Sequence, residues 1–395
     1  MSRRINLLYA LINIFLWGAY GVLVAYASRY FLHLGLTNTQ SGILLGLGTG
    51  LSFLIQPLLT GVIERLHVSV QRIVCILTAT ILLGTLPLLP LIGRRVPAVV
   101  LFSVACVCVQ ALPSFVNALG MSAIHGGLPL NYGPSRGLGS VSFALCVQGV
   151  NLLLIRFGMR SLAVCAAVLT LGLLISTLCF PQPEQARLER REASRFPQFF
   201  LENRRFFLLL TGCVLLLVST SAMTNFMYQI AIFKGSGDAQ GTAVMIAAIV
   251  ELVPMALFTR MLRRARCEFW LKLSGIFCTL RLALTLLLPG IAGLYIAQLA
   301  QMLGYALYTV SSVYYVGMVV AKKDEVKGQT YLGAVCTVGG LLASIFSGLL
   351  IDALGVQQML LVYTGVSALG ALLLFFSVQR TPAAKAAGVP TKLQN

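Results

Sequence analysis

Charged residues are scarce in this chain of 395 residues, and acidic ones are the scarcest. Only 10% of the residues are charged, with 11 Asp and Glu against 29 Lys and Arg. Ordinary soluble domains carry about 25% charged residues, which excludes a soluble protein of usual composition. The hydrophobic content of 58% and the mean hydropathy of +0.90 instead indicate an integral membrane protein.

Residues that usually hold metals, cofactors or nucleotides are also few. The 3 histidines (His33, His67 and His125) lie at loops or span ends without metal-ligand spacing. Of the 10 cysteines, only Cys106 and Cys108 are close in sequence, and two residues apart on a helix they diverge. No P-loop is present. We therefore expect no metal, cofactor or disulfide framework and no nucleotide-driven pump, and a membrane-embedded enzyme is only a remote alternative.

Long apolar runs fill most of the chain. A helical span needs about 20 apolar residues, and about twelve such runs can be counted. They cover residues 5–30, 40–63, 72–93, 97–124, 137–156, 161–181, 206–232, 241–259, 269–289, 291–320, 329–351 and 358–378. The sequence predicts an all-α membrane protein with twelve transmembrane helices.

The basic residues predict the orientation of these spans. With the N-terminus inside, 22 of the 29 Lys and Arg residues fall on cytoplasmic segments, six fall outside, and Arg281 lies in a span. This bias is the positive-inside pattern, so both termini should be cytoplasmic. The net charge of +18 then reflects topology, and we expect the lipid bilayer and a small-molecule solute, but no nucleic acid, as partners.

The spans divide into two sets of six. A charged stretch at residues 182–205 separates a bundle at 1–181 from a bundle at 206–380, and residues 381–395 form a tail. Asn38–Gly42, which opens the second span, has a counterpart in Asp238–Thr242, which opens the eighth. Two parallel six-helix repeats are typical of the major facilitator fold, whose solute site lies between the halves near mid-membrane.

Glu251 is the only carboxylate deep inside an apolar run, and Arg281 is equally isolated in the next run. A charge at the bilayer centre costs at least about 2.5 kcal/mol, so such residues usually face a bundle interior or a wet cavity. From the rise per residue, both lie at similar depth on adjacent antiparallel helices. They could pair or share water, either as a transport site or as a structural ion pair.

Polar side chains recur on single faces of three spans, at helical spacing. The residues are Asn13, Trp17 and Tyr20 on the first span, Asn225, Tyr228 and Gln229 on the seventh, and Gln298, Gln301, Tyr305, Tyr308, Ser312 and Tyr315 on the tenth. Lipid-facing surface has no use for amides and phenols. These faces predict a central cavity that binds solute, although helix contacts would explain the tenth-span stripe equally well.

Two loop motifs resemble the major facilitator superfamily. Residues 56–66 read QPLLTGVIERL, which resembles the motif between its helices two and three, with Thr60 in place of the first Gly. Residues 130–143 read LNYGPSRGLGSVSF, which resembles the motif that opens helix five in the branch of lactose permease, phenylpropionate permease and nucleoside symporters. The resemblance implies that Glu64, Arg65 and Arg136 gate the cytoplasmic side.

The resemblance also implies functional residues inside the spans. Arg136 takes the position of an Arg that binds sugar in lactose permease, but the Glu that pairs with it there has no equivalent, which leaves Asn117 as the polar candidate. Glu251 and Arg281 are placed like the Glu of helix eight and the Arg of helix nine. The His of helix ten falls at Gln301, and the proton-carrying Glu at Gly304. Sugar specificity is therefore not implied, and proton coupling would rest on Glu251.

The sequence as a whole predicts a secondary transporter, and not an enzyme, in a bacterial cytoplasmic membrane. It would move a sugar or glycoside, a nucleoside or an aromatic acid by alternating access, as a monomer driven by a proton gradient. A drug or metabolite exporter of the same fold is the alternative.

The orientation is testable with a reporter fused after Asn395. Because the basic residues favour cytoplasmic termini, a fluorescent reporter should be active there and alkaline phosphatase should be inactive. Active alkaline phosphatase would show that the assignment of inside and outside loops is reversed.

Overall fold

The computed structural model describes residues 2–88, 94–181, 204–320 and 325–380, and it leaves out the side chains of Ser2, Glu64, His125, Arg204, Glu325 and Val326. The predicted linker at 182–205, apart from its last two residues, and the predicted tail at 381–395 lie outside the described residues. The described part contains helices and no strand. Twelve helical segments are long and apolar enough to cross a membrane, which confirms the predicted fold class.

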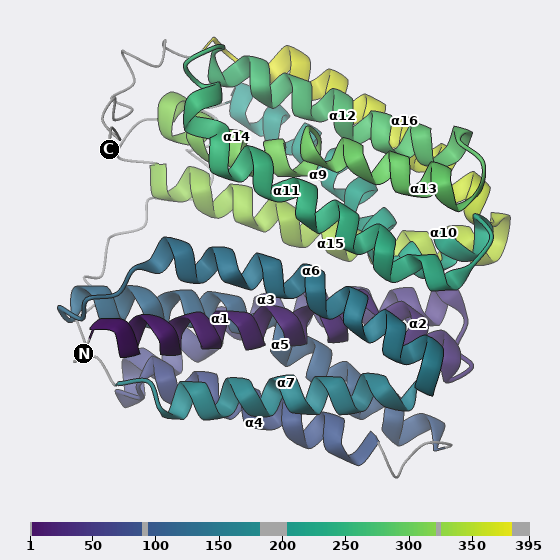
Figure 1. Ribbon diagram of the computed structural model, residues 1–395. Helices are drawn as coiled ribbons and strands as arrows, with labels where there is room; N and C mark the ends of the chain where they lie inside the picture. Colours follow the sequence, from purple (N-terminus) through teal and green to yellow (C-terminus); the bar gives the residue numbers. More distant parts are fainter. Residues whose placement is uncertain (1, 89–93, 182–203, 321–324, 381–395) are drawn as a thin grey trace.

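The first half of the chain forms one bundle of long helices, shown in purple to blue in Figure 1. Its elements are α1 (Ser2–Ala25), α2 (Ala27–His33), α3 (Asn38–Leu66), α4 (Val70–Thr85), η1 (Leu86–Leu88), α5 (Arg95–His125), α6 (Tyr132–Phe157) and α7 (Arg160–Leu178). Helix α1 packs against α5, α6 and α7 and is therefore central to the bundle.

The second half forms the other bundle, coloured teal to yellow in Figure 1. Its elements are α9 (Arg204–Asn225), α10 (Met227–Phe233), η2 (Gly237–Ala239), α11 (Gln240–Met261), α12 (Cys267–Leu287), α13 (Gly290–Leu299), η3 (Ala300–Met302), α14 (Tyr305–Val319), α15 (Glu325–Leu354) and α16 (Val356–Ser377). The tenth span, expected to be one helix, is divided by η3 and Gly304 into α13 and α14.

Matching breaks relate the two halves. The first span breaks at Tyr26 between α1 and α2, and the seventh breaks 200 residues later at Phe226, between α9 and α10. The turn that follows each short helix contains a glycine with positive φ, Gly35 at 78° and Gly235 at 128°. Only glycine adopts this conformation without strain. The weak sequence repeat thus corresponds to a repeated structural unit.

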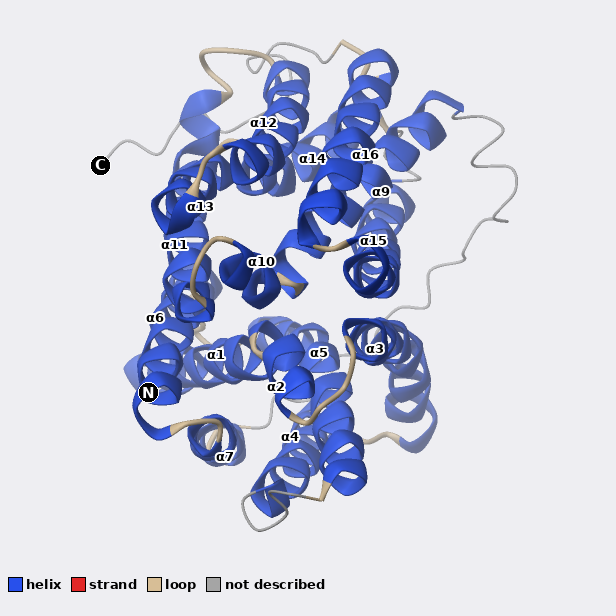
Figure 2. Ribbon diagram, turned by 90° about the vertical axis from the view of Figure 1, so that its right-hand side faces the viewer, coloured by secondary structure: helices blue, strands red, loops and turns tan. Residues whose placement is uncertain are grey.

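The halves meet along two helix pairs, α3 with α15 and α6 with α11, which lie side by side in Figure 2. We call the end of the bundle with Ser2, His67 and Met261 the terminal end, and the end with Gly158 and Gly355 the distal end. Every hydrogen bond between the halves in the described residues uses a first-half residue within 25–39 or 148–151, and all of these residues are distal.

Glycines mark where the contact between the halves begins and stops. A Cβ at Gly42 on α3 would overlap the backbone of Ser344 on α15, so the two helices touch through backbone atoms near the distal end. Nearer the terminal end, a Cβ at Gly61 on α3, Gly137 on α6 or Gly333 on α15 would meet no atom within 4 Å. The halves are closed together distally and separate toward the terminal end.

Replacing Gly42 by Leu should therefore force the distal ends apart. The new side chain collides with backbone, which cannot move aside as a flexible side chain would. Spin labels can be attached through unnatural amino acids at Arg156 and Gln357, which are both exposed at the distal end. The distance between the two labels, measured by double electron–electron resonance, should be longer in this variant. Gly61→Leu, with open space around it, is the matched control and should leave the distance unchanged. An unchanged distance in Gly42→Leu would contradict the close contact.

Candidate functional site

Glu251 lies halfway along α11 and is half-buried. Its Oε1 accepts a hydrogen bond of 2.7 Å from Nε2 of Gln301 in η3. The other amide atom, Oε1 of Gln301, is buried without a hydrogen-bond partner. The carboxylate is thus held by a neutral amide that still has an unused acceptor.

Arg281 on α12 is 3% exposed. Its Nε and Nη2 donate to Oε1 of Gln298 on α13, at 3.2 and 2.5 Å, while Nη1 has no partner. Glu251 acts on this guanidinium electrostatically, but no salt bridge within 4 Å joins them in the described residues. The two charges predicted to pair or share water are each bound to a different glutamine of the same broken span.

The first half contributes an aromatic cluster around Arg136. The guanidinium of Arg136 lies 4.0 Å from the centroid of the Trp17 ring, and its Nη1 donates to Oγ of Ser140 at 3.2 Å. The Trp17 and Tyr20 rings are 5.4 Å apart. A Cβ on Gly139 would overlap the Trp17 ring, so the glycine of the helix-five motif allows α6 to pack on this ring and places Arg136 over it.

Helices α6 and α11 relate the two parts of the site. They pack together, and Oγ1 of Thr242 on α11 donates to Oε1 of Gln148 on α6 at 3.2 Å. Counted from this contact toward the terminal end, Glu251 lies nine residues along α11 and Arg136 lies twelve residues along α6. The two groups therefore lie at similar depth on neighbouring helices. Tyr305 begins α14, and its ring stacks on Tyr308 at 6.5 Å.

A separate set of polar residues closes the distal end. The carboxylate of Asp352 on α15 accepts from the backbone N–H groups of Asn38 and Thr39, at 3.3 and 2.7 Å, and from the Asn38 side chain at 2.8 Å. This places a negative charge at the N-terminus of α3, where the helix dipole favours it. Nearby, Arg29 forms an ion pair of 3.4 Å with Asp238.

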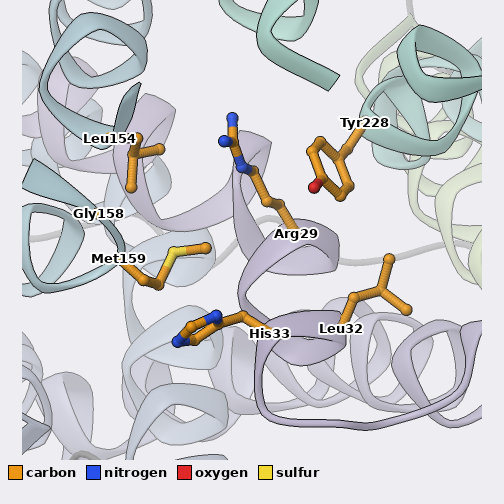
Figure 3. A pocket seen from close by; sticks show the side chains of 7 residues that line it. All are labelled: Arg29, Leu32, His33, Leu154, Gly158, Met159 and Tyr228. Carbon is orange, nitrogen blue, oxygen red and sulfur yellow. The ribbon is translucent and has the colours of Figure 1, made fainter. Parts of the chain in front are cut away.

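A small cavity adjoins this closure and has a volume of about 350 Å³. Figure 3 shows Arg29 between Leu154 and the ring of Tyr228, whose centroid lies 4.7 Å from the guanidinium carbon. The lining residues are Arg29, Leu32, His33, Leu154, Gly158, Met159 and Tyr228. This cavity lies at the distal end, apart from Glu251 and Arg281.

The comparisons with known proteins agree with this architecture. Residues 7–362 match the model of the MFS_1 like family, a group within the major facilitator superfamily. The chain belongs to this family. It is thus a multi-pass membrane protein of the major facilitator superfamily, as its loop motifs indicated. No curated protein matches the chain in sequence.

Solved structures of the superfamily share the fold at low sequence identity. The nucleoside transporter NupG aligns with a TM-score of 0.80 at 16% identity, covering 94% of this chain and 98% of that one, and a mutant of NupG aligns at 0.82 and 16%, covering 95% and 100%. A peptide transporter of the POT family aligns at 0.69 and 9%, covering 95% and 96%. An inward-facing bacterial homologue of the human lysosomal transporter Spinster aligns at 0.66 and 12%, covering 95% and 97%.

Several polar residues predicted to bind solute have hydrogen-bond partners within the protein, and their role in binding stays a prediction. Asn13 is fully buried and donates to the backbone of Tyr9 in its own helix. Gln229 is buried in the distal closure, where its amide contacts Ser28 and Asn38, and Tyr228 lines the distal cavity. Asn225 donates to Ser344 of α15 at 2.9 Å. The break at Phe226 turns Tyr228 and Gln229 toward the closure, whereas Asn225 precedes the break.

Of the remaining predicted residues, some lie at the site and others lie at helix ends. Asn117 accepts from the hydroxyl of Tyr132 at 2.9 Å, so it lies beside the Arg136 cluster. Gln298 is fully buried and positions Arg281. For the gate, Arg65 is exposed at the end of α3 and the side chain of Glu64 is outside the described residues, so gating by this pair stays a prediction. Cys267, just before the predicted ninth span at 269–289, is buried at the start of α12.

Sequence reasoning missed the distal closure. Asp352 and Asp238 lie at the ends of apolar runs, where carboxylates usually face water. The signal that could have identified Asp238 is its place in the repeat, at the position of Asn38 in the first half. No comparable signal marks Asp352, whose role depends on how the halves pack.

The packing of Gly139 on Trp17 can be tested with a neighbouring control. Gly139→Ala should displace the ring, destabilise the protein by about 1–3 kcal/mol and shift the emission of Trp17, measured in a Trp270→Phe background that leaves one tryptophan. Gly137→Ala, two residues earlier and with no atom within 4 Å of its Cβ, should change neither property. Equal behaviour of the two variants would contradict the contact.

Proposed function

We propose that this protein is a secondary transporter that moves a small organic solute by alternating access, coupled to proton symport through Glu251. The solute would be a sugar or glycoside, a nucleoside or an aromatic acid. The observation that carries the proposal is the half-buried carboxylate of Glu251, halfway along a membrane-spanning helix and held by the Gln301 amide.

The end-to-end asymmetry of the halves supports alternating access. They are hydrogen-bonded at the distal end and separate at the terminal end, so a site around Glu251 would open in one direction at a time. With both termini in the cytoplasm of a bacterium, as the basic loops favour, this is an inward-facing state. Opening to the outside requires Asp352 to release the N-terminus of α3. One chain supplies both sides of the site, so we propose a monomer.

The Gln301 amide suits a carboxyl group that gains and loses a proton. Toward ionised Glu251 it donates through Nε2, as observed at 2.7 Å. Toward protonated Glu251 it can also accept through Oε1, which is buried and unpartnered, because an amide offers a donor and an acceptor side by side. Either charge state of Glu251 is then hydrogen-bonded, which makes both accessible at membrane depth.

Two transport assays, exchange and accumulation, distinguish a proton-coupling role of Glu251 from a structural one. In proteoliposomes, Glu251→Gln should still exchange solute between two pools but should not accumulate it under a proton gradient, because the introduced amide carries no proton that can leave. Glu268→Gln is the control, since Glu268 pairs with Arg266 at the end of α12 and this variant should accumulate solute normally. Accumulation at the native rate by Glu251→Gln would leave Glu251 a structural residue and favour uniport or export.

A further inference from the structure

We propose that the solute is an amphipathic organic anion, an aromatic or apolar body with one carboxylate, whose charge is bound between Arg281 and Arg136. This inference rests on the proposed transport function and narrows its solute class. It arises from an imbalance of charge among the described residues inside the spans, where the guanidinium groups of Arg136 and Arg281 are accompanied by one carboxylate, that of Glu251.

Each described carboxylate is bound by a group other than Arg136, so Arg136 has no acidic partner among the described residues. Asp238 pairs with Arg29, and Glu268 pairs with Arg266. Asp352 binds the N-terminus of α3, and Glu251 binds Gln301. The other carboxylates of the chain belong to side chains outside the description, at 64, 184, 189, 192, 202, 324 and 325, which the sequence assigns to loops and helix ends.

Arg281 carries an unused hydrogen-bond donor. Its guanidinium is 3% exposed, its only side-chain partner is a neutral glutamine, and Nη1 is buried without an acceptor. Leaving such a donor unsatisfied costs about 1–3 kcal/mol or more for a charged group. A carboxylate of the solute would satisfy it, and guanidinium groups favour carboxylates because two parallel N–H donors match the two oxygens.

Arg136 presents a second cation from the other half. Its guanidinium carbon lies over the Trp17 ring, 4.0 Å from the ring centroid, and Nη1 donates to Ser140. A guanidinium group has five N–H donors, so this bond leaves others to bind an anion. The rings of Trp17 and Tyr20 beside Arg136, and the ring of Tyr305 at the start of α14, offer faces for an aromatic or apolar body.

The position of Glu251 near Arg281 would make binding of the anion depend on protonation of Glu251. While Glu251 is ionised, it partly compensates Arg281 and repels a solute carboxylate. Protonation removes that charge, so anion affinity rises as pH falls, and the two ligands cross together without net charge. A neutral sugar or nucleoside would gain little from the protonation of Glu251.

Other ionisable groups near Glu251 do not replace it. The described groups on the elements that pack against α11 are Tyr132, Arg136, Cys146 and Arg156 on α6, Tyr228 and Lys234 on α10, Asp238 on η2, Tyr295 on α13, and Tyr305, Tyr308, Tyr314 and Tyr315 on α14. Among these and the α12 residues, Arg281 is the charged group that interacts electrostatically with Glu251. A guanidinium group cannot load a proton in place of the carboxylate.

Trp17 provides a direct binding signal. With Trp270→Phe, Trp17 is the only tryptophan of the chain, and an anion bound at Arg136 should change its fluorescence. The probes are phenylacetate, benzoate and indole-3-acetate, each against its neutral amide, with uridine and phenyl β-glucoside as neutral solutes. Between about pH 6 and pH 8 the probe carboxylates stay ionised, so any pH dependence belongs to the protein.

We expect at least one carboxylate to bind roughly tenfold or more tightly than its amide, with affinity rising as pH falls. Arg136→Gln and Arg281→Gln should each remove most of this preference, whereas Arg260→Gln, which replaces an exposed arginine at the end of α11, should retain it. Glu251→Gln should bind the carboxylate with an affinity that no longer depends on pH.

Binding of an amide, uridine or the glucoside as tightly as the carboxylates, or failure of all three carboxylates to bind, would overturn the anion class. Either result would leave the proposed transport function standing if the neutral solutes accumulate in proteoliposomes. Carboxylate binding without accumulation under a proton gradient would instead contradict symport and retain the solute class.

Discussion

The whole site depends on keeping two opposite charges, Glu251 and Arg281, solvated at membrane depth without letting them neutralise each other. A direct salt bridge would be the simplest way to reduce the cost of burying them, but a closed pair binds neither a proton nor a solute readily. Here Gln301 holds the carboxylate and Gln298 holds the guanidinium. The charges remain coupled through space, and each keeps capacity for another ligand.

This arrangement requires the break in the tenth span. Gln298 lies in the last turn of α13 while Gln301 lies in η3, and Gly304 precedes the next helix, where a Cβ would contact backbone of α12 at 3.2 Å. Because the chain at Gly304 lies this close to α12, Gln301 reaches Glu251 on α11 and Gln298 reaches Arg281 on α12. A residue larger than glycine at this position would require the neighbouring backbone to move by a few tenths of an ångström. Gly304, where the resemblance to lactose permease places a proton-carrying Glu, therefore has a packing role.

The sequence alone predicts the features that depend on amino-acid composition and on the periodicity of a helix. Twelve spans, the repeated opening of spans two and eight, and the depth of Glu251 and Arg281 all follow from apolar runs and helical rise. Contacts that depend on breaks do not follow. Helical spacing continued through Phe226 assigns Tyr228 and Gln229 to the cavity together with Asn225, whereas the break directs Tyr228 and Gln229 to the distal closure. For Asn13 the sequence does not show that Nδ2 bonds the backbone of its own helix while Oδ1 is buried without a partner.

The two halves share the same backbone plan around the site, but they supply different charged residues to it. The breaks at Tyr26 and Phe226 and the glycine turns that follow them are 200 residues apart, so each half has an equivalent short helix after its first long one. The chemistry is not repeated. The first half supplies Arg136 on an aromatic surface, and the second supplies the carboxylate and its opposing Arg281. In the proposed cycle, a solute held between them would contact both halves, so its binding energy and the protonation of Glu251 would act on the same interface that the distal contacts hold closed.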